Sequence, residues 1–274
     1  MLYYAPAKIN LSLDIIRKRE DGYHELKMIM QTVSLYDKLY IEVSDELSLT
    51  SNKADIPLDN RNLVWKAAEL FFDYIKTDKK CKIYIEKNIP DGAGLGGGSS
   101  DAATTLLALN EIFDSGLSED ELINIAVKIG ADVPFFILKG TCMAEGIGEK
   151  LTKIENKTNP FVLIYKPEFS ISTKWAYDNL NLKNKTVYNL DTIVENLKNP
   201  AYNFENIFNY LEDVSIPNFP QIKNIKITMK NLGATASLMS GSGSSVFGIF
   251  DDETKAKQAF EGFEKSRTFL VKFV

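Results

Sequence analysis

Alternating apolar and polar positions dominate the first quarter of the chain. In the segment 7–16, apolar residues occupy every second position from Ile9 to Ile15, and this pattern predicts a strand with Lys8 and Asn10 together on its polar face. Further strands are predicted over 28–35, 38–43 and 81–86, with Tyr36-Asp37 as a turn between the first two.

Helical spacing follows these strands. Apolar residues recur at helical intervals over 62–75, and a second helix is predicted from Ser99 to about Phe113. Ser118 with Glu121 three residues later forms a capping-box pattern, so a third helix is predicted from there to about Gly130.

A polar stretch over 151–160 is predicted to be a linker between two domains, 1–155 and 156–274. The second part mixes strands over 161–165, 236–239, 246–250 and 268–274 with helices over 221–232 and 253–265. Helices and short, antiparallel-looking strands are thus mixed throughout, so an α+β fold in two domains is predicted.

Composition and charge argue against several classes of function. The chain has 274 residues, with 32 basic and 37 acidic residues and a net charge of −5, so nucleic acid is a poor partner. The apolar runs are too short to cross a membrane, and no secretory signal is seen, so a cytoplasmic location is expected. Cys81 and Cys142 have no metal-ligand spacing, and His24 is the sole histidine, which disfavours a Ser-His-Asp triad or a multi-histidine metal site.

The richest chemical signal is a glycine-rich loop from Pro90 to Ser100, which leads directly into the second predicted helix. Glycines allow a ligand to approach the backbone, and the amides at a helix N-terminus bind anions, so the loop is predicted to hold phosphates. The alternative is a flexible turn with Ser99 or Ser100 as the helix cap.

Two familiar phosphate motifs do not fit this loop. Gly92, Gly94 and Gly97 have the spacing of the dinucleotide-binding motif. In that motif the helix after the loop leads into a strand of a βαβ unit, whereas here the predicted helix is followed by another helix. A P-loop needs Gly-Lys before Ser or Thr, whereas Gly98 precedes Ser99 directly.

Three stretches together resemble the GHMP kinases, a family that includes galactokinase, homoserine kinase and mevalonate kinase. They are 6–11 (PAKINL), 90–102 and 240–245 (SGSGSS). The segments 21–26 (DGYHEL) and 130–136 (GADVPFF) resemble a member whose acceptor carries a cytidine diphosphate group and which serves isoprenoid precursor synthesis. The resemblance implies an N-terminal domain like one from a ribosomal protein, a ferredoxin-like C-terminal domain, and ATP-dependent phosphorylation of a small-molecule alcohol.

The resemblance also implies the catalytic residues. Asp132 is expected to be the general base that takes the proton of the acceptor hydroxyl, with Lys8 beside it to stabilise the developing charge. From the residues alone, Asp132 could equally be a turn residue between Gly130 and Pro134, and Lys8 a solvated strand lysine.

The acceptor site is expected to include Asn10, Tyr23, His24, Thr173 and Tyr177, with Tyr23 stacking on cytosine and His24 bonding its edge. A lone histidine is otherwise a structural residue, and Trp175 could serve in place of Tyr177.

ATP is expected to contact residues from the loops and from one helix start, namely Asn62, Leu63, Pro90, Gly94, Leu95, Gly96, Gly97, Gly98, Ser99, Ser100, Gly241 and Ser242. Asn62 also fits a plain helix cap, and Gly241 an ordinary turn. The family uses Mg²⁺, for which no protein ligand is evident. Asp101 is the nearest carboxylate, and its place near a helix start has an adequate dipole explanation.

Two other functions stay open at this point. The chain could phosphorylate a different small molecule, or it could be a catalytically inactive relative that binds a sugar or nucleotide. Either a monomer or a homodimer is compatible with the sequence.

Overall fold

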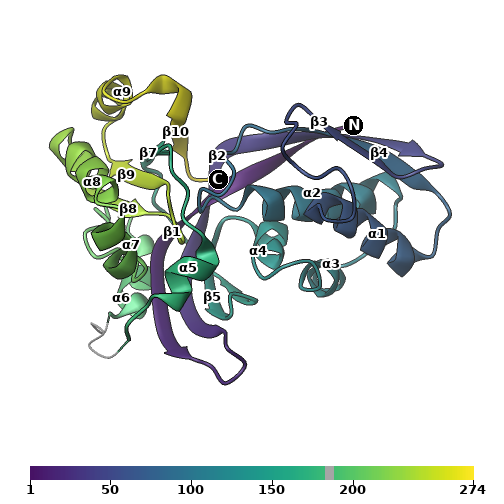
Figure 1. Ribbon diagram of the computed structural model, residues 1–274, viewed down its shortest axis with the longest axis horizontal. Helices are drawn as coiled ribbons and strands as arrows, with labels where there is room; N and C mark the ends of the chain where they lie inside the picture. Colours follow the sequence, from purple (N-terminus) through teal and green to yellow (C-terminus); the bar gives the residue numbers. More distant parts are fainter. Residues whose placement is uncertain (183–187) are drawn as a thin grey trace. The chain divides into compact units, whose positions relative to one another are not determined.

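The structure, a computed structural model, describes residues 1–182 and 188–274 of the chain (Figure 1). The residues divide into two units. The first comprises Met1–Ala7, Leu35–Asp91 and Gly96–Lys139, and the second comprises Lys8–Ser34, Gly92–Leu95 and Gly140–Val274. Each unit therefore draws on several separate parts of the sequence.

Two long strands, β1 (Leu2–Lys18) and β2 (His24–Ser44), pair with each other and contribute residues to both units. The other elements of the first unit are β3 (Ser48–Ser51), α1 (Leu63–Ile75), β4 (Lys80–Glu86), α2 (Gly97–Ile112), α3 (Glu119–Ala126) and α4 (Val133–Leu138).

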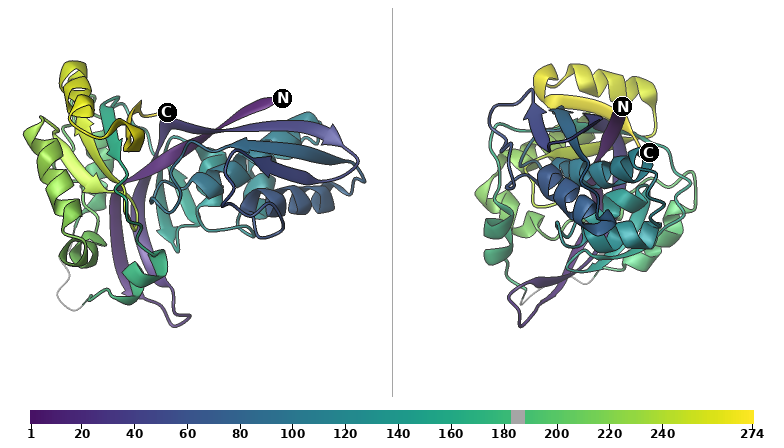
Figure 2. Two further views of the ribbon diagram at one scale, coloured as in Figure 1. Left: turned by 45° about the horizontal axis from the view of Figure 1, so that its top comes forward. Right: turned by 90° about the vertical axis from the view of Figure 1, so that its right-hand side faces the viewer.

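In the first unit, β4 pairs antiparallel with the C-terminal half of β2 and parallel with β3. Along β4 the burial alternates, so that Ile83 and Ile85 are buried whereas Tyr84 is exposed. The helices α1 to α4 lie on one side of these strands in Figure 1 and in the left view of Figure 2. This alternation follows from the two-residue period of a strand with one covered face.

The remaining elements of the second unit are β5 (Thr141–Gly146), β6 (Lys150–Lys153), β7 (Phe161–Tyr165), α5 (Thr173–Asp178), α6 (Leu190–Leu197), α7 (Glu212–Asn218), α8 (Gln221–Asn231), β8 (Ala236–Met239), β9 (Val246–Phe250), α9 (Glu253–Glu261), the 3₁₀ turn η1 (Lys265–Arg267) and β10 (Thr268–Lys272).

In the second unit, β5 pairs antiparallel with the N-terminal half of β2 and with β6. A separate antiparallel sheet has the order β10-β7-β9-β8. Helices α8 and α9 pack on this sheet, and every residue of the central strand β9 is buried. The chain therefore combines helices with two mainly antiparallel sheets, as predicted for an α+β fold.

Several predicted elements are confirmed. The helix predicted over 62–75 is α1, and the strands predicted over 161–165, 236–239 and 246–250 are β7, β8 and β9. The capping box at α3 is present, because Ser118 Oγ accepts from the Glu121 amide at 3.3 Å and Glu121 Oε2 accepts from the Ser118 amide at 2.9 Å.

Other element predictions are wrong. Tyr36-Asp37 is not a turn, because β2 runs through it and Asp37 is a buried partner of ionic and backbone groups. The first three residues of the predicted linker, Leu151 to Lys153, belong to strand β6 (Lys150–Lys153) instead, since they pair with β5. For the apolar run after Asp132 no element was predicted; it forms the short helix α4, whose first turn accepts Pro134 because no intrahelical amide donor is needed there. Among the described residues, no helix is long and apolar enough to cross a membrane.

Candidate active site

Lys8 and Asn10 lie on the same face of β1, as the alternation predicted. Lys8 Nζ donates a hydrogen bond to Asn10 Oδ1 at 2.7 Å, and Asn10 Nδ2 contacts Met28 Sδ at 3.4 Å. Both polar side chains are buried, which is rare for a lysine without a partner. The solvated-lysine alternative is therefore wrong, and the ammonium is held in place.

The first half of the glycine-rich loop joins this strand. The Lys8 amide donates to Leu95 O at 2.9 Å, and Ser240 Oγ donates to Gly94 O at 2.9 Å. Gly94 has a φ of +75°, and a Cβ atom there would lie 2.0 Å from Ser240 O. Only glycine allows the two small-residue loops to approach this closely.

The loop Ser240–Ser245 also reaches the predicted acceptor residues. A Cβ on Gly241 would lie 3.3 Å from Asn10 Oδ1 and 3.4 Å from Lys8 Nζ. Ser242 Oγ and Thr173 Oγ1, the latter at the start of α5, are 2.9 Å apart in a hydrogen bond. The second unit thus brings together Lys8, Asn10, Gly94, Leu95, Thr173, Gly241 and Ser242.

The predicted cytosine-site residues also belong to the second unit. The rings of His24 and Tyr177 stack with centroids 5.2 Å apart at an interplanar angle of 30°. Tyr23 is 62% exposed. Burial lowers the pKa of His24, and the positive charge of Lys18 lowers it further. His24 is therefore neutral near pH 7 and can both donate and accept a hydrogen bond.

The second half of the glycine-rich loop forms the start of α2 in the first unit. Gly96 is the N-cap residue with a φ of +73°, and the Ser100 amide donates to Gly96 O at 2.9 Å. Ser100 Oγ is buried and has no hydrogen-bond partner among the described residues. The first amides of a helix have no acceptor within the helix, so the start of α2, with this hydroxyl, suits an anion.

Asn62 and Leu63 lie at the start of α1. Asn62 Oδ1 accepts from the Val64 amide at 2.9 Å, and Asn62 Nδ2 donates to Pro57 O at 2.7 Å, so Asn62 is a helix cap. Leu63 lies near the glycine-rich segment, since a Cβ on Gly98 would be 3.9 Å from Leu63 Cδ1. Pro90 is half-buried where the loop begins.

Asp132 occupies the N-cap position of α4, but its side chain makes no capping hydrogen bond. It is half-buried. The backbone around Asp132 forms a turn, because the Val133 amide donates to Gly130 O at 3.1 Å, as the turn alternative predicted. A catalytic role for the carboxylate stays a prediction. Asp132 belongs to the first unit and Lys8 to the second, so their predicted pairing stays a prediction.

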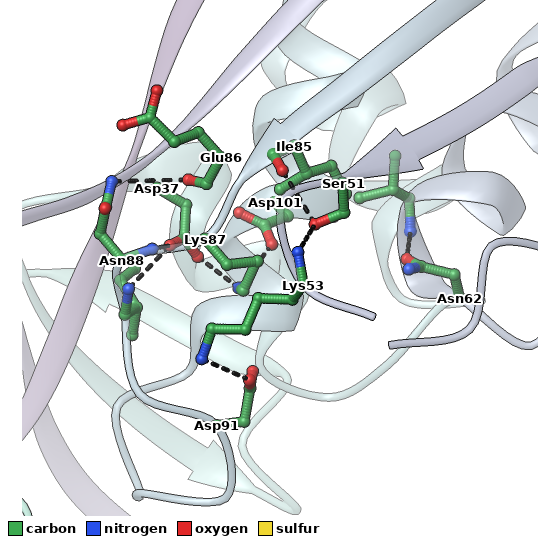
Figure 3. A network of polar contacts seen from close by, with 12 residues as sticks. Asp37, Ser51, Lys53, Asn62, Ile85, Glu86, Lys87, Asn88, Asp91 and Asp101 are labelled. Atoms are coloured by element: carbon green, nitrogen blue, oxygen red, sulfur yellow. Dashed lines mark hydrogen bonds and ion pairs between the residues drawn. The ribbon is translucent and has the colours of Figure 1, made fainter. Parts of the chain in front are cut away.

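A buried ionic cluster, which the sequence did not reveal, lies beside the start of α2. Figure 3 shows Lys87 between two carboxylates: Lys87 Nζ donates to Asp101 Oδ2 at 2.8 Å and is also paired with Asp37. Asp37 Oδ1 accepts from the amides of Asn88 at 2.6 Å and Ile89 at 2.8 Å. We call Lys87, Asp37 and Asp101 the Lys87 cluster.

The Lys87 cluster holds the strand before the glycine-rich loop to the helix after it. A Cβ on Gly97 would lie 3.1 Å from Lys87 Nζ, so the ammonium is packed against the first turn of α2. Asp101 lies beyond that turn, and its pairing with Lys87, rather than the helix dipole, accounts for its position.

Burial determines the ionisation of the Lys87 cluster. Burial raises the pKa of Asp101 to about 8, although the charge of Lys87 opposes the shift. Burial also disfavours the charged form of Lys87, but the carboxylates of Asp101 and Asp37 outweigh it and raise the Lys87 pKa. Two carboxylates around one ammonium therefore favour retention of a proton on Asp101.

A polar residue within a strand pattern was the available signal for this cluster. Asp37 lies two residues from Leu35 and two from Leu39, so a continuous strand places all three side chains on the same buried face. The prediction of a turn at Tyr36-Asp37 interrupted this pattern. Lys87 and Asp101 are 14 residues apart, and only the fold brings them together.

Two family models match the chain. The model described as "GHMP kinases N terminal domain" matches residues 62–140, and "GHMP kinases C terminal" matches 190–266. The chain belongs to the GHMP kinase family, as the three motifs indicated.

Curated relatives are similar over nearly the whole chain. A protein from Clostridium botulinum (strain Loch Maree / Type A3) named 4-diphosphocytidyl-2-C-methyl-D-erythritol kinase is 47% identical over 272 residues, covering 97% of this chain and 96% of the relative. A protein of the same name from Clostridium novyi (strain NT) is 46% identical over 96% of both chains.

Solved structures agree. A crystal structure of 4-(cytidine 5'-diphospho)-2C-methyl-D-erythritol kinase is 33% identical with a TM-score of 0.86, covering 100% of this chain and 99% of that one. A homoserine kinase from Cytophaga hutchinsonii, at 17% identity and a TM-score of 0.80, covers 100% of this chain and 94% of its own and shares the fold. The predicted two-domain GHMP kinase fold is confirmed.

Proposed function

We propose that this chain transfers the γ-phosphoryl group of ATP to the C2 hydroxyl of 4-diphosphocytidyl-2-C-methyl-D-erythritol, a step of isoprenoid precursor synthesis. The observation that carries the proposal is the full-length similarity to kinases named for this acceptor. The geometry supports it, because a held lysine and asparagine lie against two glycine-rich loops in the second unit.

In the proposed reaction, the oxygen of the acceptor hydroxyl bonds to the γ-phosphorus while Asp132 accepts the proton of that hydroxyl. The bond from that phosphorus to the bridging oxygen breaks, and ADP leaves with the electron pair. Lys8, held by Asn10, supplies a fixed positive charge beside the reacting oxygen. The carboxylate of Asp132 is suited to this role because no capping bond occupies it.

The acceptor's cytosine is proposed to bind at Tyr23, His24 and Tyr177. An exposed tyrosine offers a ring face to the base, and a neutral histidine can bond its edge. Thr173 and Asn10 are proposed to contact the rest of the acceptor.

ATP is proposed to bind along the loop from Pro90 to Ser100, with Asn62 and Leu63 near its nucleoside and Gly241 and Ser242 completing the site. The unused Ser100 hydroxyl and the α2 amides fit phosphate oxygens.

Magnesium fits this site as an ion held chiefly by the nucleotide. The described residues contain no group of three or more His, Cys, Asp or Glu placed to bind a metal, and Asp101 is paired with Lys87. Mg²⁺ is commonly bound by substrate phosphates and water with one or two carboxylates at most, and when bound it neutralises phosphate charge. We assign it no protein ligand.

The two proposed domains, 1–155 and 156–274, each contain one matched family model. The oligomeric state, monomer or homodimer, and the cytoplasmic location stay predictions.

The test is ADP release by purified protein with ATP and Mg²⁺, comparing the cytidyl acceptor with mevalonate and homoserine. Turnover with the cytidyl acceptor alone is expected. Turnover with another acceptor would retire the cytosine site, and turnover with none would favour the inactive binding protein.

Asp132→Asn tests the proposed base. We expect kcat to fall about 100-fold or more, with little change in the KM for either substrate, because a general base acts in the transition state. Asp120→Asn, which alters an exposed acid at the start of α3, is the matched control. Near-normal turnover by Asp132→Asn would show that Asp132 is not the base.

A further inference from the structure

The segment Phe208–Tyr210 lies alongside the strand that carries Lys8 and Asn10. The Leu13 amide donates to Phe208 O at 2.9 Å, and the Tyr210 amide donates to Leu13 O at 2.9 Å. Leu13 and Asn209 thereby form a parallel bridge. Asn209 is thus fixed through its backbone to β1, a few residues from the proposed catalytic lysine.

The side chain of Asn209 binds the loop Ser240–Ser245. Asn209 Nδ2 donates to Met239 O at 2.8 Å and to Gly241 O at 2.7 Å, and Asn209 Oδ1 accepts from the Leu211 amide at 3.0 Å. The residue is 4% exposed. Both amide donors are used on the two carbonyls that flank Ser240, so one side chain fixes that turn of the loop.

A second side chain, which is largely buried, holds the same residue, Met239. Glu212 Oε1 accepts from the Met239 amide at 2.7 Å, and the same carboxylate is paired with Lys226 on α8. Met239 is therefore held at its N–H by Glu212 and at its carbonyl by Asn209. A loop with this anchorage has little freedom at its first residues.

The position of this loop matters because of what lies next to it. A Cβ atom on Gly241 would lie 3.3 Å from Asn10 Oδ1 and 3.4 Å from Lys8 Nζ. Ser240 Oγ donates a hydrogen bond to Gly94 O. A shift of the loop by a few tenths of an ångström changes the space around Lys8 and Asn10. Catalysis depends on the placement of such residues, because reacting groups must be held in one geometry.

We propose that Asn209 is a positioning residue for phosphoryl transfer, one that fixes the Ser240–Ser245 loop against Lys8 and Asn10 by linking it to β1. The inference rests on the proposed function for its effect on turnover, and on hydrogen bonding alone for its effect on the loop.

The test compares two asparagine-to-aspartate variants of the full chain. Asn209→Asp keeps the side-chain shape and the acceptor for Leu211 but removes both donors to the loop. Asn156→Asp is the matched control, because Asn156 Nδ2 also donates two bonds, to Gln31 Oε1 and Thr141 Oγ1, both at 3.0 Å. None of these three residues is assigned to the active site.

We expect Asn209→Asp to lower kcat about 10-fold or more and to raise the KM for the cytidyl acceptor, whereas Asn156→Asp changes thermal stability without this kinetic loss. Equal kinetics for the two variants at equal loss of stability would overturn the proposal, since a merely structural asparagine behaves that way.

Amide hydrogen exchange of the substrate-free protein separates this inference from the proposed function. Exchange over residues 239–245 is expected to rise in Asn209→Asp and to stay unchanged in Asn156→Asp. If Asn209→Asp fails to fold, Asn209→Ala removes both donors without burying a charge, and the same rise is expected. Unchanged exchange in the folded variant would overturn the anchor even if the chain phosphorylates the cytidyl acceptor, and absence of turnover in the unaltered protein would instead refute the proposed function.

Discussion

The two small-residue loops of this protein are held by opposite kinds of chemistry. The glycine-rich segment that starts α2 is flanked by the Lys87 cluster, in which three ionisable groups are buried together. The Ser240–Ser245 loop is held by Asn209, a neutral amide whose donors and acceptor are all used, and the Glu212–Lys226 ion pair bonds only the Met239 amide before the loop.

The difference has consequences for stability. Buried charges lose their hydration, and they are stabilised only while every partner is present. A buried amide loses less hydration and does not titrate. We therefore expect the Lys87 cluster to make stability depend strongly on pH and on the removal of one charge. The hydrogen bonds of Asn209 should make stability depend on these much less.

Removal of the central charge should have the largest effect. Lys87→Met removes the ammonium that Asp37 and Asp101 share and leaves their buried polar groups without that partner, and we expect the free energy of unfolding to fall by about 3–5 kcal/mol, measured by urea denaturation. The control is Lys38→Met, whose pair with Glu86 is partly exposed at 36% and 30% and should matter by about 1 kcal/mol or less. Similar losses in the two variants would contradict the importance of burial.

A methyl group between the loops should have the next largest effect. Gly94→Ala places a Cβ against Ser240 O and forces alanine into a positive φ, so we expect a loss of about 2–3 kcal/mol in the free energy of unfolding. Gly98→Ala is the matched control for stability, because its Cβ would meet no atom closer than 3.9 Å. If Gly94→Ala is as stable as Gly98→Ala, the close approach of Gly94 to Ser240 is wrong.

The pH dependence of stability should distinguish the two anchors. Burial raises the pKa of Asp101 from 3.8 to about 8, with Lys87 and Asp37 facing it, so the folded state binds more protons than the unfolded state in this interval. The free energy of unfolding is therefore expected to fall as pH rises from about 4 to about 8. Asp101→Asn should flatten most of this slope and leave the part due to Glu212, whose pKa burial also raises. Urea denaturation across this range is the measurement, and an unchanged slope in Asp101→Asn would assign the effect elsewhere.

A single neutral cap should have the smallest effect. Asn62→Ala removes the acceptor for the Val64 amide, and we expect a loss of about 1 kcal/mol in thermal or urea denaturation. Asn62→Asp keeps that acceptor and should retain most of the stability. If both variants lose the same amount, the bond from Asn62 Nδ2 to Pro57 O matters more than the cap.

Local pattern predicted many elements and the site motifs. The alternation around Lys8 and Asn10 correctly placed them on one face, and the capping box at Ser118 correctly began α3, because both depend on neighbouring residues only. The glycine-rich loop was predicted to bind phosphates because glycines directly before a helix expose backbone amides to an anion, and this pattern is local in the sequence.

Prediction failed where a residue's partner is distant in the sequence. Asp37 was interpreted as a turn residue, although its partners Lys87, Asn88 and Ile89 lie some 50 residues away in the segment that follows β4. Asn209 was not predicted to have a role, because no residue near it in the sequence indicates its hydrogen bonds to Met239 and Gly241.

The sequence by itself determined the family, the fold class and the segments that form the proposed site, since these depend on local periodicity and on motifs that read in order along the chain. Only the tertiary structure decided how the loops are held, by charges at Lys87 and by a neutral amide at Asn209. The physical reason is that burial and long-range hydrogen bonding exist only once distant segments pack together, and no local pattern records which polar groups will meet.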